Sequence, residues 1–242
     1  MRTTRIYYPH NLSAEQTVIL TDQAANHLRN VLRAQISDEC ILFNGDGYEY
    51  HARISALNKK DVQVQITDNI LCPRQSPLAI HLGQGISRGE KMDWVIQKTT
   101  ELGVQEITPL ITERCNVRLD AERWEKKRQH WQAVAISACE QSGRTDIVTV
   151  HLPQLLSTWL QTTFSGKRIM LDPNASQGFG QISPITIIQL LIGSEGGFSD
   201  HEIQTATTAG FVGVQLGPRI LRSETAPLAA ISILQYIYGD FA

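Results

Sequence analysis

The stretch Ile187–Ile192, IIQLLI, runs directly into the loop Gly193-Ser194-Glu195-Gly196-Gly197-Phe198. A short apolar run that ends in glycines is typical of a buried strand of a parallel sheet and the loop that leaves it. Three glycines within five residues let a ligand approach the backbone closely, because no Cβ blocks it. Ligands of open parallel sheets bind beyond the carboxyl ends of the strands, so we expect a binding site at this loop.

Strand-like and helix-like segments alternate before and after this stretch. The apolar positions from Met92 to Leu102 follow helical spacing and end at Gly103, and a long helix is expected from about Ala121 to Cys139. Further short strands are expected at Leu78–Leu82, Ile107–Ile111, Arg168–Leu171 and Val212–Leu216. This alternation predicts an α/β fold with a parallel sheet covered by helices on both faces.

The N-terminal part has a different pattern. Tyr48–Ala56 and Val62–Ile66 alternate apolar and polar residues, as half-buried strands do, and a helix is expected from Ala24 to Leu32. Residues up to about Ile70 therefore resemble a small, mostly antiparallel β barrel with one helix. The two prolines of Cys72–Pro77 separate the two patterns, which predicts domains at residues 1–72 and 73–242.

Composition and charge indicate an ordinary globular protein. The chain has 242 residues, of which 42% are hydrophobic and 19% charged, and a net charge of -2 does not by itself indicate a polyanionic partner. The four cysteines are irregularly spaced without a CxxC pair, so we expect reduced thiols, a cytoplasmic protein and no metal. The N-terminus lacks a signal-peptide pattern, and the apolar segment Ala226–Tyr238 is too short to span a membrane.

A second loop at the same edge of the expected sheet carries charge. Arg219 and Arg222 are half of the four basic residues after Val150 and lie beside Glu224. Guanidinium groups at the mouth of a charge-poor sheet favour an anionic partner, whereas the alternative is a structural pair between Arg222 and Glu224. Glu195 either contacts a ligand or braces its loop.

The segment after Phe198 is expected to have a structural role, and the absence of several known motifs excludes common functions. Ser199 and Glu202 have the spacing of a capping box, so they are expected to cap the next helix. The sequence contains no GxxxxGK[ST], GxGxxG, HExxH or GxSxG pattern. P-loop nucleotide hydrolysis, dinucleotide binding and the common hydrolase chemistries therefore lack support.

Several ordered motifs together resemble the bacterial 16S ribosomal RNA (uracil-N3)-methyltransferase family over essentially the whole chain. In the N-terminal domain these are Arg5-Ile6-Tyr7 and Asn26–Arg33, NHLRNVLR. The remaining strings are Arg88–Met92, Gln97–Val104, Thr112–Cys115, Glu140–Arg144, Leu191–Gly197 and Leu216–Ala226. One departure is Ser194, where the family commonly has proline; the freer backbone is expected to change cofactor affinity only modestly.

The resemblance implies a PUA-like RNA-binding barrel followed by a SPOUT methyltransferase domain, whose C-terminal trefoil knot binds S-adenosylmethionine. It also implies a homodimer with the cofactor pocket near the interface. The cofactor-binding residues that it implies lie in the loops after the last strands: Leu171, Ile192, Gly193, Glu195, Gly197, Leu216, Gly217, Arg219, Ile220 and Leu221.

The chemistry of uracil methylation suggests catalytic residues. The N3 proton must leave before the nitrogen can attack, and the negative charge then spreads onto the two flanking carbonyl oxygens. A guanidinium would stabilise that charge, so Arg222 or Arg114 is expected to do so, with Glu140 as proton acceptor or orienting group.

RNA binding is expected to rest on phosphate contacts and to weaken with salt. The resemblance implies 16S rRNA or the small ribosomal subunit as the partner, and a chain with a net charge of -2 is expected to bind it through a local basic patch. The candidate contacts are Arg5, Arg29, Arg33, Arg88, Lys91, Arg118 and Arg144, in addition to Arg114. Two alternatives remain at this point: a non-catalytic RNA-binding assembly factor, and a SPOUT methyltransferase that acts on tRNA or on a ribose hydroxyl.

Overall fold

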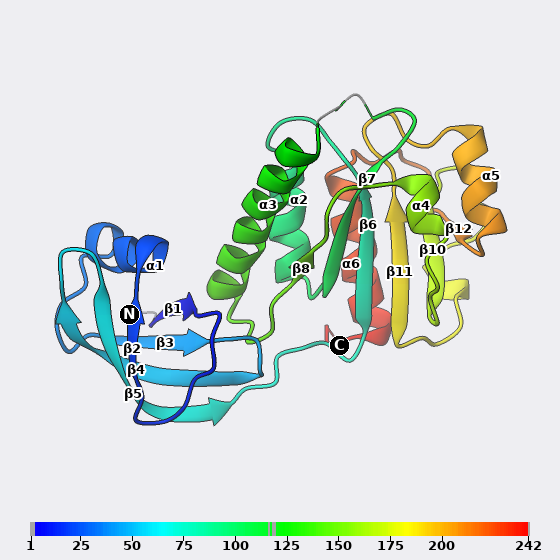
Figure 1. The fold of residues 1–242 in the computed structure, drawn as a ribbon. Coiled ribbons are helices and arrows are strands. Elements are labelled where there is room, and N and C mark those ends of the chain that lie inside the picture. The colour runs from blue at the N-terminus through cyan, green and yellow to red at the C-terminus, as the bar shows by residue number, and fades with distance from the viewer. Residues whose placement is uncertain (1–2, 116, 118–119, 242) are drawn as a thin grey trace. The chain divides into compact units, whose positions relative to one another are not determined.

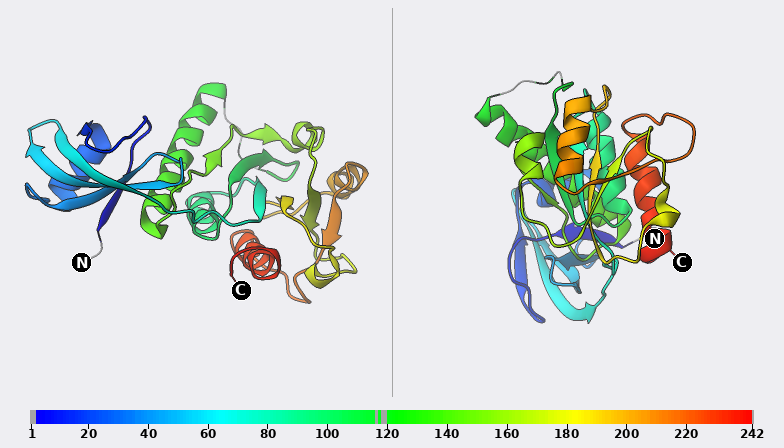
Figure 2. Two further views of the ribbon diagram at one scale, coloured as in Figure 1. Left: turned by 90° about the horizontal axis from the view of Figure 1, so that it is seen from below. Right: turned by 90° about the vertical axis from the view of Figure 1, so that its right-hand side faces the viewer.

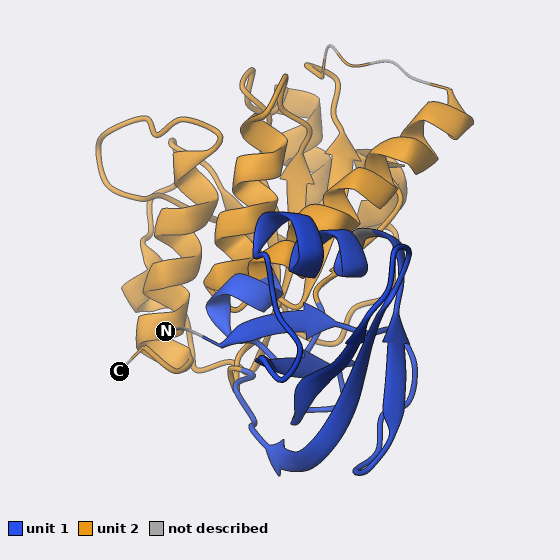
Figure 3. Ribbon diagram, turned by 90° about the vertical axis from the view of Figure 1, so that its left-hand side faces the viewer, with its two compact units in different colours: residues 1–75, 139–147 blue, residues 76–138, 148–242 orange. Residues whose placement is uncertain are grey.

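The computed structural model describes residues 3–115, 117 and 120–241, which form two compact units. The first contains the N-terminal residues up to Gln75 together with Cys139–Ile147, and the second contains Ser76–Ala138 and the residues from Val148 onward (Figure 3). The first break lies near the prolines that predict a boundary at residue 72. The sequence pattern does not predict that Cys139–Ile147 belongs to the first unit.

The first unit is a curled five-stranded sheet in the order β1-β3-β4-β5-β2. Its strands are β1 (Thr4–Tyr7), β2 (Thr17–Leu20), β3 (Glu39–Phe43), β4 (Tyr48–Leu57) and β5 (Val62–Leu71). β1 pairs with β3 in parallel and the other pairs are antiparallel, so the mostly antiparallel sheet is present. β1 and β2 lie at its two edges, and α1 (Asp22–Asn26) continues as a π-helical turn, His27–Val31.

Alternation along the strands builds the core of the first unit. Tyr50, Ala52 and Ile54 of β4 are buried, while Arg53 and Ser55 on the other face of the strand are exposed. β3 is joined to β4 by a tight turn in which Gly45 and Gly47 have φ values of 102° and 91°, a region that favours glycine. Buried side chains from each of the five strands and from the helical segment form one hydrophobic cluster.

The second unit is an all-parallel sheet in the order β12-β10-β11-β6-β7-β8, with β9 also paired to β7 (Figure 1). Its strands are β6 (Ala79–Gly85), β7 (Glu106–Ile111), β8 (Thr149–Val150), β9 (Gln154–Leu155), β10 (Lys167–Leu171), β11 (Ile187–Ile192) and β12 (Val212–Val214). Its helices are α2 (Lys91–Glu101), α3 (Ala121–Ser142), α4 (Leu156–Leu160), α5 (Asp200–Thr208) and α6 (Thr225–Tyr238), with a short 3-10 turn at Phe179–Gln181.

Helices cover both faces of this sheet. Leu110 of β7 and Leu191 of β11 belong to a hydrophobic cluster with Trp159 of α4 and Ala206 of α5. α2 and α6 pack against each other on the opposite side (Figure 2). There the Gln235 side-chain amide donates to the carbonyl of Leu102, just after α2, at 3.0 Å. The predicted parallel sheet with helices on both faces is thus confirmed.

The element boundaries follow local signals closely. α2 ends beside Gly103, whose φ of 91° is that of a C-terminal capping glycine. The capping box predicted at the start of α5 is present, because Ser199 and Glu202 bond each other's backbone N–H groups. The helix expected to end at Cys139 continues to Ser142, and the strand expected to reach Leu216 ends at Val214. No helix in the described part of the chain has the length and apolar character needed to cross a bilayer.

Candidate active site

A cavity of about 570 Å³ opens at the carboxyl ends of β10, β11 and β12, within the second unit. Small-molecule sites commonly measure roughly 300–1,000 Å³. The loops that leave the three strands line most of the cavity, since β10 pairs in parallel with both β11 and β12 and the strand ends therefore meet at one edge. The site lies where a parallel sheet gathers its loops, as the sequence pattern predicts.

The loop after β11 is a tight turn that needs its glycines. The N–H of Gly197 donates to the carbonyl of Ser194 at 2.9 Å, and the φ of Gly197 is 66°. A Cβ on Gly193 would lie 3.2 Å from Gly197 Cα, and one on Gly85 would lie 2.3 Å from Ser194 N. There is thus little room for a side chain at Gly193 or at the facing Gly85, while Gly197 is required for its backbone conformation, and the loop presents its backbone to the cavity.

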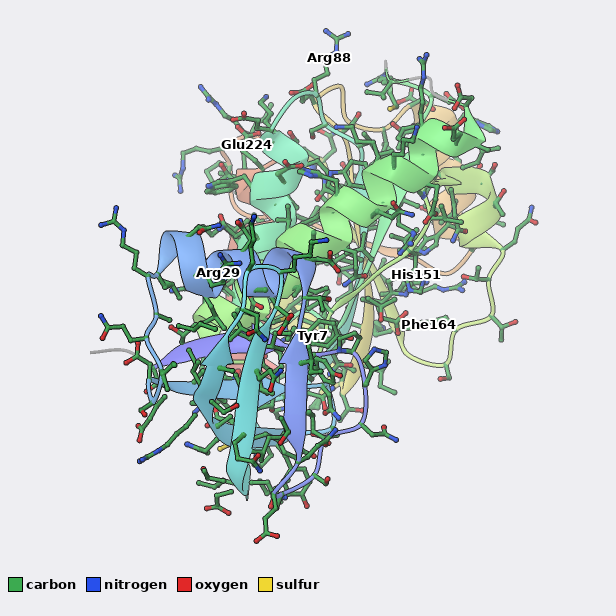
Figure 4. The ribbon with its side chains drawn as sticks, turned by 60° about the vertical axis from the view of Figure 1, so that its left-hand side comes forward. Tyr7, Arg29, Arg88, His151, Phe164 and Glu224 are labelled. Atoms are coloured by element: carbon green, nitrogen blue, oxygen red, sulfur yellow. The ribbon has the colours of Figure 1, made fainter. Side chains whose placement is uncertain are left out.

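The loop after β12 returns to the cavity and leads into α6. Gly217 has a φ of 75°, and the N–H of Ala226 donates to the carbonyl of Arg222 at 2.9 Å as the helix begins. The buried Ser223 hydroxyl accepts a bond from Ser87 at 3.2 Å and donates to Glu224 at 3.1 Å. These contacts place Glu224, labelled in Figure 4, on the cavity wall at the N-terminus of α6.

Lys91, the first residue of α2, connects both glycine-containing loops. Its Nζ donates to Glu195 Oε1 at 2.5 Å and lies 3.8 Å from Glu224 Oε2. Of the two roles left open for Glu195, the structure therefore provides a contact that braces the loop. The alternative pair between Arg222 and Glu224 is not among the ion pairs of the described residues, in which Lys91 is the partner of Glu224.

The same contacts shift two pKa values. The hydrogen bond to Glu195 raises the pKa of Lys91, and the charges of Glu195 and Glu224 act in the same direction. Burial alone would raise the pKa of Glu224. Bonds from its own backbone and from Ser223, with the positive charges of Lys91 and Arg222, outweigh that effect and lower it. Lys91 and Glu224 are therefore both charged near neutral pH.

Three guanidinium groups surround the cavity. Arg114, Arg219 and Arg222 line it and are exposed to solvent. Arg114 Nη1 donates to the carbonyl of Gly196 at 2.9 Å, which connects the loop after β7 to the loop after β11. Arg219 and Arg222 form no ion pair with any described residue, so both are available to a ligand.

The structure brings together most of the residues singled out from the sequence. All ten residues expected to bind the cofactor line the cavity: Leu171, Ile192, Gly193, Glu195, Gly197, Leu216, Gly217, Arg219, Ile220 and Leu221. Arg114 and Arg222 line it too, and so does Lys91, which was expected to contact RNA. Of the other basic residues expected to contact RNA, Arg33 and Arg88 are exposed. Arg29 is half-buried and donates to the carbonyl of Lys59 (Figure 4), and Arg118 lies outside the described residues.

Glu140 is not among the residues that line the cavity, in contrast to its expected role as proton acceptor. It belongs to the first unit, where its Oε1 accepts the backbone N–H of Tyr7 at 3.0 Å. Burial raises the pKa of Glu140, although the Tyr7 N–H and the charges of His27 and Arg5 oppose the shift. The carboxylate therefore has a structural role that joins the end of α3 to β1.

Arg5 and Arg144 are also corrected by the structure. The Arg5 side chain is only 6% exposed; it pairs with Glu49 and donates to the carbonyl of Arg144 at 3.0 Å. The Arg144 side chain is 7% exposed and pairs with Asp146. Guanidinium groups that are buried and paired with carboxylates are not available to RNA phosphates, so neither is retained as a candidate contact.

Sequence reasoning missed part of the cavity wall. Asp172 and Asn174 follow β10, and the Asp172 carboxylate accepts the Asn174 N–H at 2.9 Å. Phe198 and Ile203 add apolar surface, and Ser194 lines the cavity with its hydroxyl 3.4 Å from that of Thr112. The position of Asp172 directly after a predicted strand was the available signal, since loops at that edge are the ones that bind ligands.

Comparison with known proteins first defines the class. A model described as an RNA methyltransferase domain matches residues 74–235, and one described as an RNA methyltransferase PUA domain matches residues 20–67. The fold is thus that of a SPOUT RNA methyltransferase domain preceded by a PUA domain, as the sequence motifs predict.

Individual relatives identify the family within this class. The ribosomal RNA small subunit methyltransferase E of Buchnera aphidicola is 38% identical over 100% of this chain and 99% of its own. The enzyme of the same name from Bacillus subtilis is 32% identical over 91% and 90% of the two chains. The Neisseria gonorrhoeae enzyme, solved bound to S-adenosylmethionine, is 41% identical over both complete chains with a TM-score of 0.94. The chain belongs to the ribosomal RNA small subunit methyltransferase E family, which confirms the resemblance found in its motifs.

Proposed function

We propose that this protein transfers a methyl group from S-adenosylmethionine to N3 of a specific uridine in 16S rRNA of the small ribosomal subunit. The observation that carries the proposal is the cavity at the carboxyl ends of β10–β12, lined by every residue that the family resemblance implies for the cofactor. The Neisseria gonorrhoeae relative and a Legionella pneumophila protein, 42% identical with a TM-score of 0.97, were both solved with this cofactor bound.

The cavity residues fit S-adenosylmethionine chemically. Leu171, Ile192 and Leu216 offer apolar walls for an adenosine ring, and the crowding at Gly193 leaves backbone groups for polar contacts. Glu195 and Glu224 line the same cavity, and their carboxylates would suit the sulfonium and the amino group of this cofactor. When bound, the cofactor supplies an electrophilic methyl group to a nucleophile placed behind it.

The chain's own residues then position the base and stabilise charge. Loss of the N3 proton to solvent water leaves negative charge on the uracil carbonyl oxygens, and a guanidinium held at the cavity mouth stabilises it. Arg222 is the preferred candidate because it lines the cavity without an ion-pair partner among the described residues. Arg114 is the second candidate, since its bond to Gly196 already holds it in place. Positioning by the loops contributes much of the rate.

RNA binding and assembly complete the proposal. The exposed Arg33 and Arg88, with Arg29, are proposed to contact rRNA phosphates. A homodimer is supported by α6 and the residues after it, where Ile233, Tyr236, Ile237 and Phe241 are 36%, 67%, 41% and 47% exposed. α6 begins at the cavity, so an interface on this helix would lie near the cofactor. The cysteines of the described chain are thiols that form no disulfide with one another, which accords with a cytoplasmic location.

Two measurements test the proposal together. Isothermal titration with S-adenosylmethionine should show one site per chain, and transfer of labelled methyl groups should favour 16S rRNA or the small subunit over tRNA. Cofactor binding with methyl transfer to tRNA alone would show that the substrate is tRNA and not 16S rRNA. Absence of cofactor binding would contradict the methyltransferase and favour the alternative, a non-catalytic RNA-binding assembly factor.

A further inference from the structure

His81, Glu106 and His151 form a cluster that the methyl-transfer site does not use. Each offers one ligand atom, and the three atoms lie within 4.8 Å of one another. The cluster lies near the amino ends of β6 and β7, whereas the cavity lies at the carboxyl ends of β10–β12. Among the described residues, it is the one group of three potential metal ligands that lie this close together. All three residues belong to the second unit.

The parallel ladder fixes the backbone of all three residues. His81 of β6 is directly opposite Glu106 of β7, so both side chains project from the same face of the sheet. His151 follows β8, and its N–H donates to the carbonyl of Ile107 at 2.9 Å. Sites on rigid strands hold their ligands more accurately than sites on loops.

Contacts around the cluster orient the two imidazoles. Thr108 Oγ1 lies 2.7 Å from His81 Nε2, and Trp159 of α4 packs edge-on against the His81 ring with centroids 5.5 Å apart. His151 Nε2 lies 2.7 Å from Glu106 Oε2. The Thr108 contact is of the kind that fixes the ring orientation of a histidine ligand, whereas the His151–Glu106 contact brings two of the candidate ligands together.

The separation of the rings suits a shared ion. An imidazole bound at about 2.1 Å has its centre about 3.2 Å from the metal, so two rings at a tetrahedral angle have centres about 5.2 Å apart. The centres of His81 and His151 are 5.4 Å apart at an interplanar angle of 40°. The side chains of Glu106 and His151 are 48% and 35% exposed, which gives an ion a route in and leaves a fourth position for water.

We propose that His81, Glu106 and His151 bind a divalent transition metal ion, with Zn²⁺ as the best match to two imidazoles and one carboxylate. The ion would link β6, β7 and the segment after β8, and so stabilise the amino edge of the parallel sheet. The sequence predicts no metal because these ligands are far apart along the chain, and only the strand register brings them together.

Co²⁺ titration of the full-length protein, first stripped with EDTA, tests this site. The wild type should bind one Co²⁺ with the visible absorption of a tetrahedral or five-coordinate complex, and Zn²⁺ should displace it and raise the Tm. His151→Ala and Glu106→Gln should each weaken the apparent Kd by more than about tenfold. Both positions are partly exposed, so the variants are expected to fold, which circular dichroism checks.

A matched control is His201→Ala, which removes the imidazole of the exposed His201–Glu113 pair. This variant should bind Co²⁺ as the wild type does. Equal Co²⁺ affinity of wild type and both ligand variants would overturn the proposal, as would equal weakening by the control. A thiolate-to-metal charge-transfer band would place the ion on a cysteine and would also overturn it.

Discussion

Lys91 Nζ and Glu195 Oε1 are 2.5 Å apart, although the residues are separated by 104 positions. This ion pair holds the loop after β11 against the start of α2. Lys91→Met should therefore raise the Kd for S-adenosylmethionine several-fold, while the Tm should change little because the pair is partly exposed. Isothermal titration and thermal melts measure the two effects. The matched control is Lys126→Met, which removes the exposed Lys126–Glu122 pair of α3 and should leave cofactor affinity unchanged.

Gly197→Ala tests the backbone of the cofactor loop. The φ of 66° at Gly197 is a conformation that costs other residues about 1–2 kcal/mol, so the loop should shift and cofactor affinity should fall by about tenfold. Gly180→Ala is the control, because Gly180 has no positive φ and a Cβ there would meet nothing within 4 Å. Equal cofactor affinity of the two variants would show that the turn is not part of the site.

Arg222→Ala tests the proposed stabilisation of charge on the base. We expect kcat for rRNA methylation to fall by roughly a hundredfold with cofactor Kd little changed, as for loss of one oxyanion donor. Arg222→Lys keeps the charge and should recover part of the rate. Single-turnover methylation separates this effect from RNA binding. If Arg222→Ala keeps the wild-type rate and Arg114→Ala loses it, the role belongs to Arg114.

Glu140→Gln distinguishes a structural role from a catalytic one by its pH dependence. Burial raises the pKa of Glu140, so the folded state favours the neutral carboxyl and loses stability relative to the glutamine variant as pH rises through that pKa. Glutamine can still accept the Tyr7 N–H. We therefore expect the variant to be at least as stable as the wild type at pH 7, with the difference vanishing near pH 4.

Methylation by the same variant supplies the second readout. Glu140→Gln should methylate at nearly the wild-type rate, because Glu140 does not line the cavity. Loss of activity in a folded, cofactor-binding Glu140→Gln variant would restore the proton-accepting role expected from the sequence.

Tyr236→Asp tests the proposed dimer. Tyr236 is 67% exposed on α6, and a charge there should disfavour a second copy packed on this apolar face. Light scattering should show a dimer for the wild type and a monomer for the variant. Glu122→Lys on exposed α3 is a control that should remain dimeric. A monomeric wild type would contradict the homodimer.

Local patterns were sufficient to predict the parallel sheet and much of the cavity. The apolar run Ile187–Ile192 and the glycines after it predict a buried strand and the loop that follows it, because a buried parallel strand is apolar on both faces. The segments β8, β9 and α4 have two, two and five residues, too few for periodicity to reveal them. The edge strand β2 is likewise only four residues long.

The roles of charged residues could not be predicted equally well. Arg5 and Arg144 have the sequence signature of RNA-binding cations, but their burial depends on Glu49 and Asp146, and only tertiary structure brings the Arg5–Glu49 pair together. The contact of Lys91 with Glu195 and that of Glu140 with Tyr7 are also long-range. Charge and spacing along the chain do not encode which carboxylate a cation will meet.

Nucleoside mass spectrometry decides the proposed reaction. Small subunits from cells that lack the gene are incubated with the purified protein and methyl-labelled S-adenosylmethionine, and the 16S rRNA is digested to nucleosides. We expect the label in 3-methyluridine, at one site per rRNA. The signal should fall in Gly197→Ala in proportion to its weaker cofactor binding, and in Arg222→Ala in proportion to its lower kcat. Label in any other nucleoside, or none with a cofactor-binding protein, would contradict the proposed N3 methylation of uridine.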